Sequence, residues 1–195
     1  EDRAEFGSMV KVTLRSMMFL LIPMMVGMMA LSRPLVALIY ERGDFGPDAT
    51  LLTSTALFFF SLGVMGYGVQ TILSRAFYAN QDGKMPFYSG VVSVITNAAL
   101  CGLLIKPMGL GGLALAAAVS SLVSALVLLV PAVKRYPEII DKKLIISFGK
   151  MAVSAGVMLF LVLGSFRFLE ARMGTGLFGR FVMLGIPTGL GVVAY

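Results

Sequence analysis

Histidine and tryptophan are absent from this chain of 195 residues, and cysteine occurs only once. Without histidine, the sequence lacks both the commonest general base and the commonest metal ligand. The single cysteine, Cys101, lies inside an apolar segment and cannot form an internal disulfide. The sequence also contains no Ser/His or Cys/His arrangement, no metal-spaced ligand set and no Walker-type phosphate loop. These absences argue against covalent catalysis.

Charged residues are also scarce. They make up 13% of the chain, against about 25% in a typical soluble domain, and hydrophobic residues make up 58%. The acidic residues lie in the N-terminal arm, in loops or near segment ends, and none lies deep inside an apolar segment. An intramembrane enzyme needs ionisable groups at depth, where they are costly and kept for function. We therefore expect no enzymatic activity, no cofactor and no metal site.

Six long apolar segments account for most of the sequence. A helix needs roughly 20 apolar residues to cross a hydrocarbon core of about 30 Å, and most of the segments are long enough. We predict an all-α, polytopic membrane protein with about six transmembrane helices in one membrane-embedded bundle. The expected helices are approximately 16–32, 49–78, 86–105, 109–133, 144–166 and 176–195.

The distribution of basic residues favours one orientation. Loops on the side of the N-terminal arm carry ten Lys and Arg residues, and the opposite loops carry six. Since cytoplasmic loops are enriched in Lys and Arg, we predict that the N-terminal arm lies in the cytoplasm. The net charge of +6 is not a nucleic-acid signature, because no segment interleaves basic and aromatic residues on a polar background.

Polar residues form a stripe on each of two predicted helices. The helix at 49–78 carries Thr50, Ser54, Ser61, Gly68, Thr71 and Arg75, and the helix at 86–105 carries Ser89, Ser93, Thr96 and Asn97. Facing stripes can line a water-filled cavity, but such groups also hydrogen-bond neighbouring helices. We interpret the serines individually as packing contacts and leave both interpretations open for Arg75 and Asn97. The candidate substrate-binding residues are Arg75, Asn97, Ser61 and Thr71.

Arg75 and Asn97 each allow two interpretations. Arg75 lies about one turn inside the end of its segment, where it can snorkel to the interface or offer its planar guanidinium to a pyrophosphate headgroup. Spacing alone favours snorkelling. Asn97 offers an oxygen to a buried cation, but the residue one turn later is Cys101 and not a carboxylate. We therefore expect no complete ion site in this chain.

Small residues recur at every fourth position of the segment 109–133. The two series are Ala116, Ser120 and Ser124, and Ala117, Ser121 and Ala125. Small side chains at this spacing let helix backbones approach closely. The pattern predicts helix–helix contact and not a ligand site.

Two motifs carry a resemblance to a known family. They are residues 38–45 (LIYERGDF) and residues 74–86 (SRAFYANQDGKMP). At their mutual spacing they resemble the C-terminal half of the MurJ (MviN) family of lipid II flippases, within the superfamily of multidrug, oligosaccharide-lipid and polysaccharide exporters. The resemblance runs from about Val10 to the end of the chain. It implies the last six helices of a fourteen-helix transporter, forming most of one of its two lobes.

This resemblance implies a function and a set of partners. The whole protein is expected to flip undecaprenyl-pyrophosphate-linked peptidoglycan precursor across the bacterial cytoplasmic membrane by alternating access. Its expected partners are this lipid, membrane lipids, the missing N-terminal lobe of the same protein and cell-wall synthesis proteins, but no nucleic acid. We interpret the chain as a fragment, because residue 1 is not Met and residue 195 lies inside an apolar segment. Most of the substrate site is then expected outside it.

The two motifs also supply candidate gate and loop residues. Gly43 permits a sharp turn on the outer side, and the second motif ends one helix and starts the next at the cytoplasmic face. The candidates are Glu41, Arg42, Gly43 and Phe45 in the first motif, and Phe77, Tyr78, Asp82 and Pro86 in the second. The alternatives are a related exporter of drugs or of another polysaccharide lipid, and a non-transporting membrane scaffold in cell-wall assembly.

Overall fold

The computed structural model describes residues 2–170, and every regular element in that range is a helix. The elements are α1 (Asp2–Ala30), α2 (Ser32–Tyr40), α3 (Pro47–Ala79), α4 (Lys84–Arg135), η1 (Pro137–Ile139) and α5 (Lys142–Glu170). Four of these helices are long and apolar enough to cross a membrane. The prediction of an all-α, polytopic membrane protein is confirmed. The helix expected at 176–195 lies outside the described residues.

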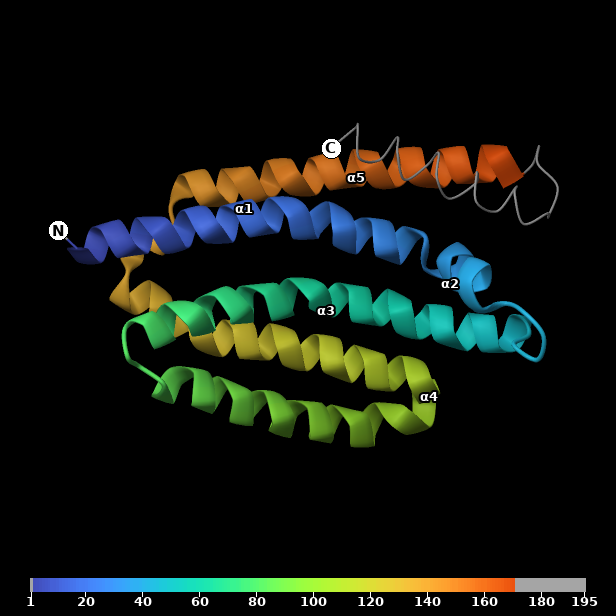
Figure 1. Cartoon of the computed structure of the whole chain (residues 1–195), viewed down its shortest axis with the longest axis horizontal. Coiled ribbons are helices and arrows are strands. Elements are labelled where there is room, and N and C mark those ends of the chain that lie inside the picture. Colours follow the sequence, from blue (N-terminus) through green and yellow to red (C-terminus); the bar gives the residue numbers. More distant parts are fainter. Residues whose placement is uncertain (1, 171–195) are drawn as a thin grey trace.

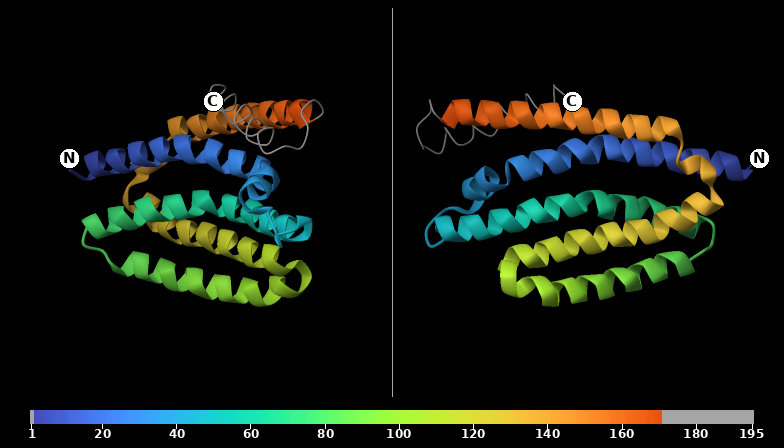
Figure 2. Two further views of the ribbon diagram at one scale, coloured as in Figure 1. Left: turned by 45° about the vertical axis from the view of Figure 1, so that its right-hand side comes forward. Right: turned by 180° about the vertical axis from the view of Figure 1, so that it is seen from behind.

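The long helices stack side by side in the order α5, α1, α3, α4 (Figures 1 and 2). The N-terminal end of α1, the α3–α4 turn and the α4–α5 connection lie at one end of the stack. The α2–α3 loop lies at the other end. The two motifs of the sequence therefore lie at opposite ends of the molecule.

The helix α4 folds back on itself and makes two passes. Its 52 residues are too many for one membrane crossing, and Gly109 has non-helical dihedral angles of φ +55° and ψ −129°. Next to this bend, a Cβ at Gly112 would overlap the carbonyl oxygen of Leu104. We call residues 84–108 the first arm and residues 110–135 the second arm. They lie where the sequence predicts the helices 86–105 and 109–133.

The helix α1 begins at Asp2, well before the predicted start at residue 16. Phe6, Val10 and Leu14 recur every fourth residue, which gives the charged N-terminal arm an apolar helical face. Val10 and Leu14 are buried, and Phe6 packs beside them. The arm is helical because this face has a partner in the fold.

The main hydrophobic cluster lies at the end of the stack that contains the α3–α4 turn. It joins α1, α3, the second arm and η1, and we call it the basal core. Its buried members are Val10, Leu14, Val69, Leu73, Phe77, Ala125, Leu128, Ala132, Tyr136 and Ile139. An ion pair between Lys11 and Asp141, 3.5 Å apart, links α1 to the connection that precedes α5 at the same end.

Small residues bring α3 and the second arm of α4 into close contact. The Ser121 hydroxyl donates a hydrogen bond to the carbonyl oxygen of Gly63 at 3.0 Å. A Cβ at Gly63 would lie 2.8 Å from the Cα of Ala118. The helix–helix contact predicted from the small-residue pattern is therefore present.

Candidate functional site

The polar stripe of the first arm contacts the second arm of α4. Ser89 is fully buried and donates to the carbonyl oxygen of Ser124 at 3.0 Å, and the two hydroxyl groups also hydrogen-bond each other. Ser93 donates to the carbonyl oxygen of Ser120 at 3.4 Å. These bonds satisfy the hydroxyl groups between two arms of one helix. The stripe does not face the polar residues of α3 across a cavity.

Asn97 belongs to the same contact. Its amide nitrogen donates to the Ser120 hydroxyl at 3.4 Å, and its carbonyl oxygen lies 3.6 Å from the sulfur of Cys101, which donates to it. Among the described residues there is no group of three or more His, Cys, Asp or Glu side chains placed to hold a metal ion. Asn97 therefore acts here as a bridge between the two arms.

The polar stripe of α3 is divided between the interior and the surface. Thr50, Ser54 and Ser61 are buried, whereas Thr71 and Arg75 are exposed. The Ser61 hydroxyl donates to the Leu57 carbonyl oxygen at 2.6 Å, and the Thr71 hydroxyl donates to its own helix in the same way. The structure thus brings Thr71 and Arg75 together, one turn apart, and separates them from Ser61 and Asn97.

The α3–α4 turn closes α3 with a Schellman motif. The N–H of Asp82 donates to the carbonyl oxygen of Phe77 at 3.0 Å, and that of Gln81 donates to the carbonyl oxygen of Tyr78 at 2.9 Å. Gln81 occupies the left-handed position with φ +58°. Pro86, a candidate of the second motif, is buried in the first turn of the first arm. This motif therefore forms an ordered turn and not an extended loop.

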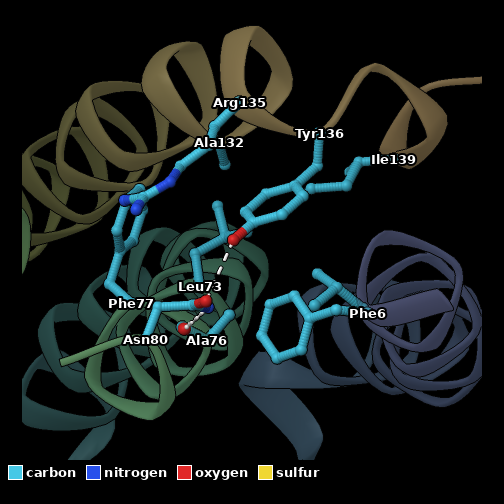
Figure 3. Close-up of a pocket in the computed structure, with 10 residues that line it drawn as sticks. Phe6, Leu73, Ala76, Phe77, Asn80, Ala132, Arg135, Tyr136 and Ile139 are labelled. Atoms are coloured by element: carbon cyan, nitrogen blue, oxygen red, sulfur yellow. Dashed lines mark hydrogen bonds between the residues drawn. The ribbon is translucent and has the colours of Figure 1, made fainter. Parts of the chain in front are cut away.

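Two residues at the end of α4 hold this turn. The Tyr136 hydroxyl donates to the side-chain oxygen of Asn80 at 3.0 Å, and the guanidinium of Arg135 lies 3.2 Å from the carboxylate of Asp82. Figure 3 shows Tyr136 pointing toward Asn80, with Phe6 of α1 beside the same cluster. We call the Tyr136–Asn80 and Arg135–Asp82 pairs the clasp. The candidate Asp82 belongs to it, while Asn80, Arg135 and Tyr136 were not predicted.

The first motif forms a compact loop at the opposite end of the stack. Gly43 has φ +57°, which permits the reversal, and the rings of Tyr40 and Phe45 lie 5.8 Å apart. The Thr50 hydroxyl at the start of α3 donates to the Glu41 carboxylate at 3.2 Å. Arg42 is exposed at the tip of the loop. Glu41, Gly43 and Phe45 therefore shape the loop, and Arg42 projects from it.

Known proteins match this chain over nearly its full length. The sequence profile described as "Lipid II flippase MurJ" matches residues 1–184. The chain belongs to the MurJ family. The lipid II flippase MurJ of Thermosipho africanus is 32% identical over 161 residues, which cover 83% of this chain and 32% of that protein. The probable lipid II flippase MurJ of Vibrio cholerae is 26% identical over 182 residues, 93% of this chain and 35% of that protein.

A solved MurJ structure shares the fold. The structure titled "Lipid II flippase MurJ, inward closed conformation" superposes with a TM-score of 0.80 and 27% sequence identity, covering 99% of this chain and 39% of that one. This similarity confirms the resemblance identified from the two motifs and the fold class predicted with it. The chain spans about a third of the length of the curated MurJ relatives it matches.

Two large cavities in this MurJ-family chain are lined only by apolar residues. One, of about 540 Å³, lies between α1 and α5 and includes Phe19, Met24 and Met158. The other, of about 670 Å³, lies among α1, α3, the second arm and α5. Neither contains a charged residue, so the charged candidates of both motifs lie outside them. Among the described residues, the charged candidates of the two motifs lie toward the two ends of the stack.

Proposed function

We propose that the whole protein flips undecaprenyl-pyrophosphate-linked peptidoglycan precursor, lipid II, across the bacterial cytoplasmic membrane by alternating access. The observation that carries this proposal is the similarity of 99% of the chain to a solved structure titled as a lipid II flippase. Curated relatives with the same name support it. In this proposal the protein is a transporter and not an enzyme.

The chain supplies only part of such a transporter. Residues 1–195 form a single membrane-embedded bundle that contributes most of one lobe, and the N-terminal lobe comes from the rest of the same protein. The length of the relatives, about three times the part matched here, supports this division. The partners are the lipid-linked precursor, the surrounding membrane lipids, the N-terminal lobe and, in cell-wall assembly, cell-wall synthesis proteins.

Arg75 is the residue we propose for contact with the pyrophosphate headgroup. It is exposed near the end of α3, and it makes no hydrogen bond or ion pair with the described part of the chain. A guanidinium presents a planar fork of donors that matches phosphate oxygens. Thr71, one turn away on the same face, provides a second polar contact. Ser61 and Asn97 are bonded inside the bundle, so we propose that they act in packing and reach substrate only if helices part.

The loop at 41–45 is proposed as part of an outer gate. Arg42 and Asp44 are exposed there, at the end of the stack opposite Arg75. Charged groups at this position are available to pair with the other lobe when the outer side closes. Glu41, Gly43 and Phe45 would hold the loop that presents them.

The N-terminal arm is proposed to lie in the cytoplasm. The structure groups the arm with the α3–α4 turn and the α4–α5 connection, and these three segments carry the larger share of Lys and Arg. The positive-inside rule places such loops in the cytoplasm. Arg75 would then meet lipid II on the side where the lipid enters.

Complementation by the full-length parent gene tests this function. The gene is expressed in bacteria depleted of their own lipid II flippase, beside Arg75→Ala and the matched control Lys134→Ala, an exposed basic residue at the same end. We expect rescue by the parent and by Lys134→Ala, and loss of rescue by Arg75→Ala at equal expression. Failure of a well-expressed, inserted parent would point to another exporter of the superfamily. Rescue that survives every substitution on the Arg75 face would favour a scaffold.

A further inference from the structure

The last turns of α3 present two faces with different surroundings. Leu73 and Phe77 lie on one face, buried in the basal core. Thr71, Arg75 and Tyr78 lie on the opposite face, which is exposed. Spacings of three and four residues place the members of each set above one another along the helix. The direction in which Arg75 points therefore depends on how the buried face is held.

The turn after α3 has a backbone conformation that its sequence does not favour. Gln81, with φ +58°, is the only non-glycine residue with positive φ in the described part of the chain. Glycine usually occupies this position of a Schellman motif, because a Cβ there crowds the neighbouring carbonyl. Such a conformation persists where surrounding contacts determine it. Gln81 therefore depends on contacts from outside the turn.

The clasp supplies those contacts on both sides of Gln81. Asn80, which precedes it, accepts the hydrogen bond from Tyr136, and Asp82, which follows it, pairs with Arg135. The side-chain nitrogen of Asn80 also donates to the Ala76 carbonyl oxygen at 2.9 Å, so the contact reaches the last turn of α3 (Figure 3). Arg135, the last residue of α4, and Tyr136, which follows it, thus hold both flanks of the strained position.

Tyr136 is itself held firmly. Only 6% of it is exposed, and its ring lies 5.4 Å from the ring of Phe6. The space left among Tyr136, Phe6, Leu73 and Ile139 is about 10 Å³, room for one water molecule at most. Because its partners come from α1, α3 and η1, Tyr136 fixes the turn relative to the whole basal core.

We propose that Tyr136 and Arg135 are positioning residues for transport, which hold the α3–α4 turn and thereby aim Arg75 at the phosphate-bearing headgroup. This inference rests on the proposed function, in which Arg75 binds that headgroup. In this proposal neither Tyr136 nor Arg135 touches the headgroup. Tyr136 has the larger effect, because its hydrogen bond is partly buried, whereas the Arg135 side chain is 42% exposed and its ion pair is screened by solvent.

Binding of fluorescent lipid II to the purified full-length protein in nanodiscs tests the proposal. Tyr136→Phe removes the hydroxyl and keeps the ring against Phe6. We expect Kd to rise about two- to tenfold, the range that corresponds to one lost hydrogen bond. Tyr88→Phe is the matched control, since Tyr88 is an exposed tyrosine near the start of α4, at the same end of the stack, and its Kd should not change. Equal Kd values for the parent and Tyr136→Phe would overturn the proposal.

Repeating the substitution in an Arg75→Ala protein separates positioning from general stability. Because Tyr136 acts through Arg75, we expect Tyr136→Phe to cause no further rise in Kd in that background. A rise of the same size in both backgrounds would show a structural effect independent of Arg75 and would refute the positioning role. For the ion pair, Asp82→Arg should weaken binding, and adding Arg135→Asp should restore it.

Spin labels attached at Lys84→Cys and Lys134→Cys, in a cysteine-free background, give the distribution of distances across the clasp without any substrate. Both positions are exposed. Lys84 follows the α3–α4 turn, and Lys134 lies next to Arg135 at the end of α4. We expect the distance distribution to broaden when Tyr136→Phe and Arg135→Ala are combined. An unchanged distribution would overturn the inference even if lipid II binds. A third outcome is that the double substitution broadens the distribution but the parent protein does not bind lipid II. That result would confirm the clasp as a contact, and it would overturn the proposed function and the positioning role with it.

Discussion

Gly66 lies at the closest approach of α3 to the second arm of α4. A Cβ there would lie 2.5 Å from the Ser121 hydroxyl oxygen and 2.7 Å from the backbone nitrogen of Leu122, which cannot move independently of its helix. We expect Gly66→Ala to destabilise the full-length protein by about 1–3 kcal/mol, the usual range for overpacking. The measurement is the thermal midpoint in detergent.

Gly90→Ala is the control for this substitution. Gly90 is also inside a helix, but nothing lies within 4 Å of its Cβ position. Alanine is favoured over glycine in a helix by roughly 0.5–1 kcal/mol, so this variant should be neutral or slightly more stable. Equal losses of stability in the two variants would contradict the close contact at Gly66.

Gln81 gives a prediction of opposite sign. Glycine adopts the left-handed conformation without the clash of a Cβ, so Gln81→Gly should raise the free energy of unfolding by about 1 kcal/mol. The same change at Gln70, inside α3, should lower the free energy of unfolding by about 1 kcal/mol because glycine disfavours helix. Unfolding in denaturant measures both. A loss of stability in Gln81→Gly would mean that the side chain contributes more than its backbone strain costs.

Residues of the clasp show where sequence analysis stops. The second motif contains Asn80 and Asp82, but their partners Tyr136 and Arg135 lie at the far end of α4. The Tyr136–Asn80 bond joins residues 56 positions apart, and no periodicity within one helix specifies such a partner. The signal that the sequence did offer was the predicted topology. It places the polar residues at the ends of two apolar segments on the same side of the membrane.

At the scale of elements, the bend of α4 depends on Gly109. Its φ of +55° combined with ψ of −129° lies in a region that only glycine adopts readily. We expect Gly109→Ala to destabilise the protein by about 1–3 kcal/mol through backbone strain. Gly102→Ala, in the regular part of the first arm with open space around it, is the control. A thermal midpoint for Gly109→Ala equal to that of Gly102→Ala would contradict the bend.

The sequence predicted helix positions correctly where the length of an apolar segment determines them. The predictions were wrong where packing against another helix determines them. The turn expected between the predicted helices 86–105 and 109–133 is present, at Gly109. The early start of α1 was missed, because the charges around Phe6 and Val10 hide their apolar face until its partner is known. The short helix α2 was likewise missed, since its nine residues are too few for a membrane span.

At the scale of the whole molecule, hydropathy identified a membrane bundle but could not order its helices. In a soluble helix, a polar face marks the outside. Here large apolar residues cover both the packed and the exposed faces, as Val162 and Phe160 show on α5. The contact between α3 and the second arm of α4 instead depends on small residues and buried hydroxyl groups, whose partners no single segment reveals. The site was harder still to predict, because relatives extend well beyond the part matched here.

Cysteine labelling from the two sides of the membrane tests the orientation of the molecule. Asp44 and Gln81 are exposed at opposite ends of the stack, so each reports one side when replaced by cysteine in a Cys101→Ser background. Because the larger share of Lys and Arg lies with Gln81, we expect a membrane-impermeant maleimide to label Asp44→Cys in intact spheroplasts. Gln81→Cys should react only after permeabilisation.

Val94→Cys provides the baseline for this experiment. Val94 is 68% exposed in the middle of the first arm, where its surroundings are hydrocarbon if α4 spans the membrane. Maleimides react with the thiolate, which a site without water does not support, so this variant should stay unlabelled on both sides. Labelling of Gln81→Cys and not Asp44→Cys in intact cells would invert the topology. Arg75 would then face the outer surface, and its contact with lipid II could occur only as the lipid leaves.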